Sequence, residues 1–386
     1  MRRDTLKVLS LVLATVMLSA IGLMRNQETF AARRGERRLA QASERVIVSD
    51  QSGKVTMQPL ERGGRVAISN RNGHIIISGW DRDAVEATAT SARGAEVVQA
   101  AVSQDPAGNR VTLSTLTRKQ RSEPDLRFSD TQLPKPSQAS PRPSPPVAPQ
   151  PAPEPMPKPT PKPGVRRTSD ALEINLEVKL PRYAEVESIE TETGGIKISG
   201  IDGPISAVRT NDGDVRIQDV GAFVNVVIKN GNIALQNIRG DVRALSLLGT
   251  ISVECAQARV EASNTRGAIT LANIGGDMDI NSTDGDIEAS SSIRAGGRYQ
   301  FRTVLGRIRM MVEPNAPGFT ATLSSYRGKI DDNFPLTLKS PPENTRRVIG
   351  RYGDGQAQIT LDSFHGDITL GKALTGSTRD CGREGR

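Results

Sequence analysis

The sequence predicts an all-β protein: a single-domain parallel β-solenoid, or β-helix, with two short strands in each turn of about eighteen residues. Residues 194–284 repeat with a period of nineteen residues once and eighteen residues four times. Glycine opens each repeat, at Gly194, Gly213, Gly231, Gly249 and Gly267, and the next one at Gly285. Apolar residues recur at fixed positions within the repeat, and such a fixed period is typical of solenoids.

The apolar positions define two strands in each turn. Positions three and five are aliphatic in all five repeats, and side chains two residues apart share one face of a strand. Positions eight, twelve and fourteen are apolar too in the eighteen-residue repeats. Gly, Asn and Asp between these positions tolerate the positive φ that corners need. We therefore expect stacked turns with aliphatic ladders inside and polar ladders outside.

An eighteen-residue turn also fits the left-handed helix of hexapeptide acyltransferases. That helix needs an aliphatic residue at every sixth position, and positions eight and fourteen comply. Position two does not, because it holds Gly195, Asp214, Asn232, Thr250 and Ala268. The two-strand turn is therefore the better prediction, and the handedness of the coil stays open.

The first 45 residues have the composition of a targeting segment and a linker. Residues 8–24 are uncharged and follow Arg2, Arg3 and Lys7. We predict that residues 1–31 form a signal peptide or a membrane anchor. Residues 32–45 are then a basic linker, whose arginines oppose export by the positive-inside rule. The rest of the chain favours export, to the periplasm, the cell surface or an anchored position in the cytoplasmic membrane.

The β pattern begins at Val46, and we assign residues 46–118 to N-terminal β rungs. Row openings occur at Gly53 and Gly73, with Trp80 at position eight of the second row. Val85, Ala87 and Ala89 should form the second strand of that turn. Residues 110–117 and 172–180 are expected to form two further alternating strands.

Residues 119–170, between those two strands, are predicted to be a disordered Pro-rich insertion in a hairpin loop. Fourteen prolines fall in residues 134–163. Proline lacks the backbone N–H and fixes φ, so this segment cannot be a strand or a helix interior. It is either an arm that spans the wall or binds a partner, or an inert spacer.

Residues 171–378 are assigned to the β-solenoid repeats and residues 379–386 to a polar tail. After Gly285 the repeats lengthen, and later openings occur at Gly306, Gly328 and Gly366. Irregular terminal turns are expected where a solenoid is capped. Asp331 and Asp332 replace apolar residues there, which suits a solvated rim.

The opening GRVAISNRNGHIIISGWD, the stretch EVKLPRYAEVESIETETGGIKISG and the G-D-I rows that follow carry a family resemblance. They resemble a bacterial family labelled putative adhesin, a β-strand-repeat domain of unknown function. The resemblance covers roughly residues 60–118 and 170–370. It implies an exported β-solenoid without a catalytic centre, and it contributes no site residues. The Pro-rich insertion departs from the short loop that is usual in the family.

We predict no catalytic, cofactor-binding or metal-binding residues. His74 and His365 each adjoin a row glycine at an exposed corner, where solvated side chains are expected. Asp214, Asp286 and Asp367 recur at position two, and we interpret them as corner residues, because calcium-binding repeats have a denser Asp ladder. Cys and His lack zinc spacing. Carboxylates are too scattered, and aromatic residues at 3% too few, for a polysaccharide-degrading solenoid.

The net charge of +8 is concentrated outside the repeats. Residues 1–45 carry +5 and residues 118–167 carry +6, which leaves −3 for the rest of the chain. The repeats therefore lack the basic stripe that nucleic-acid binding requires. Of the two cysteines, Cys255 falls at a corner and Cys381 in the polar tail. A disulfide is one alternative, but two free or oxidised thiols is the interpretation we favour.

These observations predict a non-enzymatic, exported cell-envelope β-solenoid that serves as an adhesin-like binding or display module. The expected partners are an unidentified protein or glycan at the envelope, and the membrane through the N-terminal apolar segment. Neither nucleic acid nor any cofactor is expected. The alternative is a membrane-anchored envelope-stress sensor or regulator, and a polysaccharide-active β-helix enzyme is a less favoured one.

Overall fold

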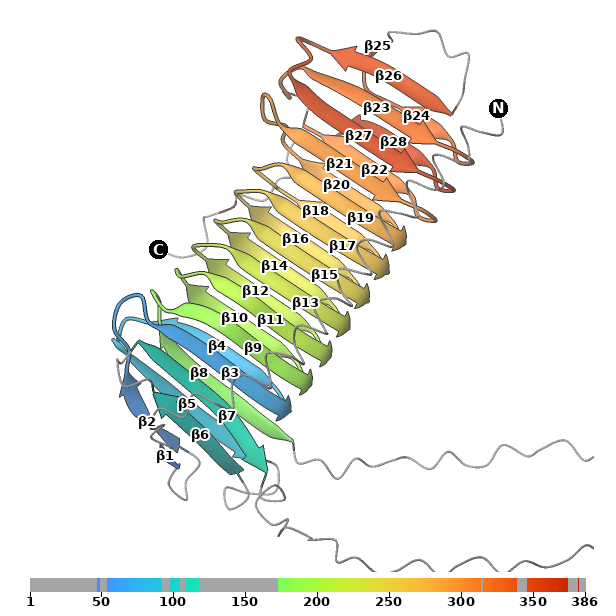
Figure 1. Ribbon diagram of the computed structural model, residues 1–386. Helices are drawn as coiled ribbons and strands as arrows, with labels where there is room; N and C mark the ends of the chain where they lie inside the picture. Colours follow the sequence, from blue (N-terminus) through green and yellow to red (C-terminus); the bar gives the residue numbers. More distant parts are fainter. Residues whose placement is uncertain are drawn as a thin grey trace, which may run out of the picture.

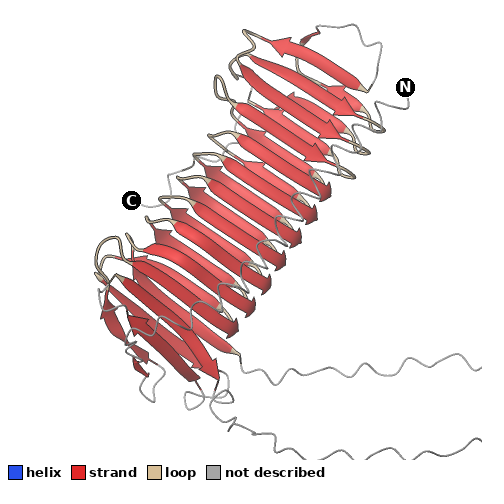
Figure 2. Cartoon of the chain, viewed as in Figure 1, coloured by secondary structure: helices blue, strands red, loops and turns tan. Residues whose placement is uncertain are grey.

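The computed structural model describes residues 47–48, 54–91, 98–104, 109–117, 173–313, 315–338, 346–373 and 381. These residues form twenty-eight strands and no helix, arranged in two long sheets along one axis (Figures 1 and 2). Sheet A has 15 strands and sheet B has 13. The predicted all-β, solenoid-like fold of parallel strands is thus confirmed. The predicted N-terminal signal or anchor, the basic linker and the Pro-rich insertion lie outside the described residues.

The middle rungs, β10 to β19, follow the predicted repeat. Even-numbered strands lie in sheet B and odd-numbered strands in sheet A. Their bounds are β10 (Ile196–Ile201), β11 (Ile205–Asp212), β12 (Val215–Val220), β13 (Val224–Asn230), β14 (Ile233–Ile238), β15 (Val242–Leu248), β16 (Ile251–Ala256), β17 (Val260–Arg266), β18 (Ile269–Ala272) and β19 (Met278–Asp284). Each strand pairs in parallel with the strand one turn further on. Val215 therefore lies beside Ile233, and Ile233 beside Ile251.

The core lies between the two sheets. Row position three forms one buried ladder, and its members are at most 2% exposed from Ile196 to Ile287. Burial alternates along the strands, as in β16, where Ile251 and Val253 are buried and Ser252 is exposed. One continuous cluster of buried apolar side chains extends from Leu60 to Leu370. No single turn could bury its apolar face alone, so stacking is what makes this core.

The row glycines line up along one edge of the stack. A Cβ on Gly249 would lie 1.7 Å from the carbonyl oxygen of Gly231, and one on Gly267 would lie 2.2 Å from that of Gly249. The φ angles of these two residues, +133° and +123°, also favour glycine. Glycine is needed at this corner because backbone of the preceding rung occupies the space that a side chain would take.

The N-terminal end departs from the simple order. Its strands are β1 (Ile47–Val48), β2 (Lys54–Pro59), β3 (Arg65–Asn72), β4 (Ile75–Trp80), β5 (Ala84–Ser91), β6 (Val98–Gln104), β7 (Arg110–Thr117), β8 (Ile174–Pro181) and β9 (Glu185–Thr193). The rung β3–β4 is parallel to its neighbours and lies between β7–β8 and β9–β10. Antiparallel strands β2 and β5 in sheet B, and β1 and β6 in sheet A, cover the end.

Three predictions for this end were wrong. The row opening at Gly53 leads into β2, which is antiparallel to β5 and is not a solenoid rung. Val85, Ala87 and Ala89 do form a strand, but β5 joins sheet B antiparallel to β8 and is not the second strand of the Gly73 turn. Strands β7 and β8 belong to different sheets, so residues 119–170 do not connect a hairpin. Alternating apolar residues identify a strand, whereas its direction and sheet depend on which edge is open.

The C-terminal end contains an inserted rung of the same kind. Its strands are β20 (Ile287–Ser291), β21 (Arg298–Thr303), β22 (Ile308–Val312), β23 (Phe319–Ser325), β24 (Ile330–Asp332), β25 (Thr337–Leu338), β26 (Arg347–Tyr352), β27 (Ala357–Ser363) and β28 (Ile368–Lys372). The rung β27–β28 lies between β21–β22 and β23–β24, as Figure 1 shows. The row that opens at Gly366 is therefore last in sequence but not last in the stack. Antiparallel β26 and β25 extend sheet A beyond it.

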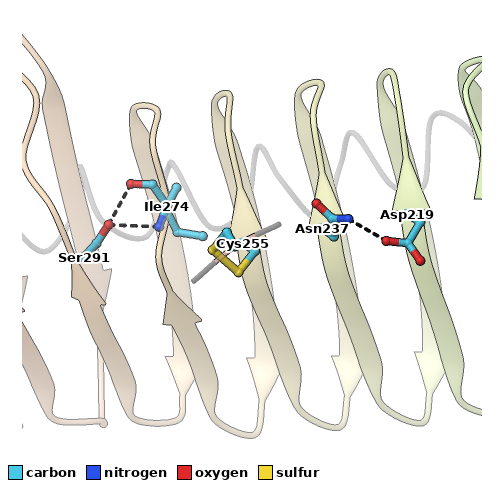
Figure 3. Close-up of a disulfide and its surroundings, with 6 residues drawn as sticks. Asp219, Asn237, Cys255, Ile274 and Ser291 are labelled. Carbon is cyan, nitrogen blue, oxygen red and sulfur yellow. Dashed lines mark hydrogen bonds between the residues drawn. A yellow bond between two sulfur atoms is a disulfide. The ribbon is translucent and has the colours of Figure 1, made fainter. Parts of the chain in front are cut away.

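Cys255 and Cys381 form a disulfide, with 5.4 Å between their Cα atoms, so the prediction of unpaired thiols was wrong. Cys255 has a φ of 59°, and Asp219, Asn237 and Asn273 adopt the same left-handed conformation at this row position. Figure 3 shows the disulfide in line with Asp219 and Asn237. The partner cysteine is 126 residues away, and β16 is four strands from β28 in sheet B. Spacing in the sequence cannot indicate that contact.

Candidate functional site

The solenoid has two kinds of corner before its row glycines. In the middle rungs the sheet A strand continues to the residue directly before the glycine, as β15 does to Leu248. The N–H of Gly249 then donates to the carbonyl oxygen of Arg266 in the next rung, at 3.0 Å. These corners are tight, and the rungs hold one another through backbone hydrogen bonds.

Near the C-terminal end the strand stops two residues earlier. Strand β27 ends at Ser363, whose hydroxyl accepts from the N–H of Gly366 at 2.8 Å and donates to the carbonyl oxygen of Gly306 at 3.1 Å. Ser325 makes the equivalent bonds to Gly328 and Gly366, each at 2.9 Å. The serine hydroxyl thus takes the place of the next rung's carbonyl oxygen as the acceptor for the glycine N–H. The two residues before the glycine then bend away from the sheet.

A buried polar ladder underlies both kinds of corner, and the sequence reasoning missed it. The third residue before a row glycine carries a hydroxyl or an amide in nearly every rung, and Ile228 is an exception. The buried members are Asn70, Thr191, Thr210, Ser246, Asn264, Ser282, Thr303, Ser325 and Ser363. In the described part of the middle rungs, the hydroxyls of Thr210, Ser246 and Ser282 have no hydrogen-bond partner. A Ser/Thr/Asn-x-x-Gly spacing in each row was the available signal.

The bends at the C-terminal end stack into what we call the C-terminal ridge, residues 304–305, 364–365 and 326–327. Backbone hydrogen bonds fix their order, because Phe364 N donates to Thr303 O and Tyr326 N donates to Ser363 O, both at 3.2 Å. The rings of Tyr326 and Phe364 stack at 4.9 Å with 9° between their planes. The guanidinium carbon of Arg346 lies over the Tyr326 ring, 4.8 Å from its centre.

A cleft adjoins this ridge at the end of the stack, where β24 is the last strand of sheet B. Its volume is about 590 Å³, and its lining is formed by Tyr326, Arg327, Gly328, Lys329, Ile330, Asp331 and Arg346. The side chains of Arg327 and Lys329 are exposed. We call this feature the C-terminal cleft. It brings three cationic groups, one carboxylate and an aromatic ring to one place.

Charges are balanced differently along the molecule. Four of the eight cations in residues 194–284 pair with carboxylates, as Arg239 does with Asp202 at 3.0 Å and Arg266 with Asp284 at 3.5 Å. Arg327 and Lys329 have no such partner in the part of the chain that the structure describes. Residues 194–284 hold eight Lys/Arg and ten Asp/Glu, whereas residues 298–372 hold eleven and seven. The C-terminal end is therefore the electropositive part of the solenoid.

The two histidines are far apart on the glycine edge. His74 is exposed, and its Nδ1 accepts a hydrogen bond from the N–H of Gly195 at 3.0 Å. His365 is exposed on the C-terminal ridge, 4.7 Å from the Phe364 ring. Eight inter-strand steps of roughly 4.8 Å each separate β4 from β28, so the imidazoles cannot act together.

The aspartates at row position two close corners. Asp214 Oδ1 accepts from the N–H of Asn232 at 2.8 Å, and Asp367 Oδ1 accepts from that of Lys329 at 2.7 Å. Burial alone would raise the pKa of Asp286, but hydrogen bonds from the backbone and guanidinium of Arg307, with its charge, outweigh burial and lower the pKa. Asp286 therefore holds the next rung in its ionised form.

Among the described residues, no group of three His, Cys, Asp or Glu side chains could hold a metal ion. In the same residues, no helix is long and apolar enough to cross a membrane. The absence of catalytic, cofactor-binding and metal-binding residues stays a prediction.

Comparison with known proteins identifies the class. The Toastrack DUF4097 family matches residues 39–371, so the chain belongs to this family. The fold resembles a solved putative adhesin from Bacteroides fragilis NCTC 9343, with 10% identity, a TM-score of 0.32, and coverage of 85% of this chain and 98% of that one. It also resembles a putative cell adhesion protein from Clostridium sporogenes ATCC 15579, with 8% identity, a TM-score of 0.19, and coverage of 85% and 100%. No curated protein matches the chain.

Proposed function

We propose that this protein is an exported, non-enzymatic β-solenoid of the cell envelope that binds or displays, in the manner of an adhesin. The observation that carries the proposal is the disulfide between Cys255 and Cys381. Structural disulfides persist in oxidising compartments and are rare in the cytosol, where thiols are kept reduced. Export is also what the apolar segment at residues 8–24 predicts.

The shape of the molecule supports binding or display. Two long sheets form one stack with a continuous core, so the solenoid is an extended rod that separates its two ends (Figure 1). The outer faces of the middle rungs carry charges, some of them in ion pairs, and polar side chains, which keep a long surface solvated. Such a rod presents the C-terminal ridge and cleft at one end. On this proposal its partner is a protein or glycan at the envelope.

The test is to locate the protein and its thiols in its own cells. We expect external protease to cleave the solenoid in intact cells or spheroplasts, and mass spectrometry without reduction to recover the linked Cys255 and Cys381 peptides. A cytoplasmic marker protein is the control for cell integrity. Full protection in both preparations, together with two reduced thiols, would refute export.

A further inference from the structure

We propose that the C-terminal cleft binds an acidic polysaccharide, a glycan segment that bears carboxylate groups. This inference rests on the proposed function and names the ligand class of the exposed end. The C-terminal cleft is lined by Arg327, Lys329 and Arg346, with Asp331 at one side. Guanidinium groups present a planar fork of N–H donors that matches a carboxylate, and ammonium groups add a compact charge.

The excess of cations over carboxylates in the repeats occurs at the C-terminal end and not in the middle rungs. Ten carboxylates offset eight cations in residues 194–284, and ion pairs such as Arg239–Asp202 and Arg266–Asp284 join neighbouring rungs. Arg327 and Lys329 flank Gly328 at one corner, and no carboxylate among the described residues is within ion-pair distance of either side chain. Two exposed cations directed to one cleft raise the local concentration of an anionic ligand.

The aromatic pair restricts the kind of anion. Phe364 stacks on Tyr326, and the Arg346 guanidinium also lies over the Tyr326 ring. Binding of single-stranded nucleic acid uses aromatic faces on which bases stack. Phe364 and Arg346 already pack against the Tyr326 ring, which leaves less of its surface for stacking on a base or on the apolar face of a neutral sugar. Recognition at this cleft therefore depends mainly on charge and hydrogen bonds.

Asp331 favours an acidic glycan over an anion that has no hydrogen-bond donor groups. Its carboxylate lines the same cleft as Arg327 and Lys329 and can only accept hydrogen bonds when ionised. A glycan that carries carboxylates supplies an anionic group for the cations and hydroxyl donors for Asp331. A polyphosphate has no such donor. The volume, about 590 Å³, lies within the range of small-ligand sites and suits a short segment of a longer polymer.

The experiment compares two charge-matched double variants of the full chain. Arg327→Gln with Lys329→Gln removes one arginine and one lysine from the C-terminal cleft. Lys197→Gln with Arg216→Gln removes the same charges from adjacent exposed positions on β10 and β12. Binding to polygalacturonate, dextran and a single-stranded oligonucleotide is measured by titration calorimetry at two salt concentrations. Thermal unfolding of each variant checks that the fold is kept.

We expect the wild-type protein to bind polygalacturonate in preference to both other polymers. The cleft variant should weaken this binding by roughly tenfold or more, and the β10–β12 variant by less than about twofold. Equal losses in the two variants would overturn the cleft as the site, and so would equal binding of dextran or tighter binding of the oligonucleotide. If the wild-type protein binds none of the polymers, the cleft proposal fails, whereas protease cleavage and the disulfide still decide export.

Discussion

The middle rungs and the C-terminal rungs are built from the same row pattern but close their corners differently. In the middle, Gly249 takes a positive φ and its N–H bonds to the next rung. At the end, Gly366 is not in the left-handed region, and its N–H bonds to the hydroxyl of Ser363 in its own rung. The first arrangement ties neighbouring rungs together tightly. In the second arrangement two residues leave the strand and form a bend, and these bends make up the C-terminal ridge.

This difference shows how a candidate binding site can form at the end of a repetitive structure. In a strict repeat each residue lies beside the residue at the same row position one rung away, as Val215 lies beside Ile233. Longer terminal rows break that match and place unlike residues side by side. Phe364 then stacks on Tyr326 although 38 residues separate them in the chain, because β27 pairs in parallel with β23. The rung β27–β28 is inserted before β23–β24, which makes β24 the last strand of sheet B, so the C-terminal cleft depends on this order of stacking.

The largest expected effect comes from a buried charge in the middle rungs. Ile251→Asp places an unpaired carboxylate between stacked aliphatic side chains at a position with 0% exposure, and should cost several kcal/mol. Ile330→Asp changes the same row position on the edge strand β24, where the side chain is only half-buried, and should cost much less. Thr250→Asp, exposed beside Ile251, should be nearly silent. Urea unfolding measures all three, and similar losses would mean that the facing of the rows is wrong.

The corner glycine gives the next largest effect. Gly249→Ala would put a Cβ 1.7 Å from the carbonyl oxygen of Gly231 at a φ of +133°, so the backbone of two rungs must move. Gly296→Ala is the matched control, because φ is +73° but nothing lies within 4 Å of the added Cβ. We expect the control to lose only about 1 kcal/mol from backbone strain and Gly249→Ala to lose several times more. Equal losses in thermal unfolding would argue against close contact of the rungs.

The disulfide joins the middle of the stack to the C-terminal tail, and its removal should cost less than disruption of the core. Cys381→Ser opens a loop of 126 residues, for which a loss of about 2–4 kcal/mol is typical. Cys255→Asn opens the same loop but restores a residue type that suits the φ of 59° at this corner, so its loss should be smaller. Denaturant melts with and without reductant give the comparison. An unchanged midpoint for wild-type protein on reduction would contradict it.

The two kinds of corner differ in how much the buried hydroxyl contributes. Ser363→Ala removes the acceptor for Gly366 N–H and a donor to Gly306, and should cost about 1–3 kcal/mol. Thr210→Val changes the same ladder position in the middle, where the hydroxyl has no partner in the described structure, and should be neutral or stabilising. The natural Ile228 at this position supports that expectation. Unfolding free energies that fall equally would show that the corners are energetically alike.

The smallest effect is a pH dependence at the C-terminal end. Burial raises the pKa of Asp362, and this outweighs the hydrogen bond from Ser324 and the charges of Arg302 and Arg347. Because the folded state prefers the protonated acid, stability should fall as pH rises from about 4, the ordinary carboxylate value, through the raised pKa. Asp362→Asn has no group that ionises at this position, so it should not lose stability as the pH rises. Its melting temperature should equal or exceed that of the wild type at pH 7, but not at pH 3. The opposite trend would mean that the arginines dominate.

Much of the middle of the molecule could be predicted from sequence. The position of each strand from Ile196 to Ala272, the faces of its residues and the line of glycines all follow from local periodicity. The candidate site could be predicted only in part. The solvated rim at Asp331 was recognised, but the stack of Tyr326 and Phe364 was not, because these residues lie in bends whose geometry the row pattern does not define.

The sequence by itself determined the rung: an apolar residue at every second position of a short strand, and glycine where neighbouring backbones come too close for a side chain. These are local consequences of strand geometry and of the missing Cβ. Only the tertiary structure decided the inserted rungs at both ends, the sheet that β5 joins, the disulfide and the C-terminal cleft. A parallel edge accepts any strand of matching pattern, so the choice among similar rows is made by the packing of the whole stack.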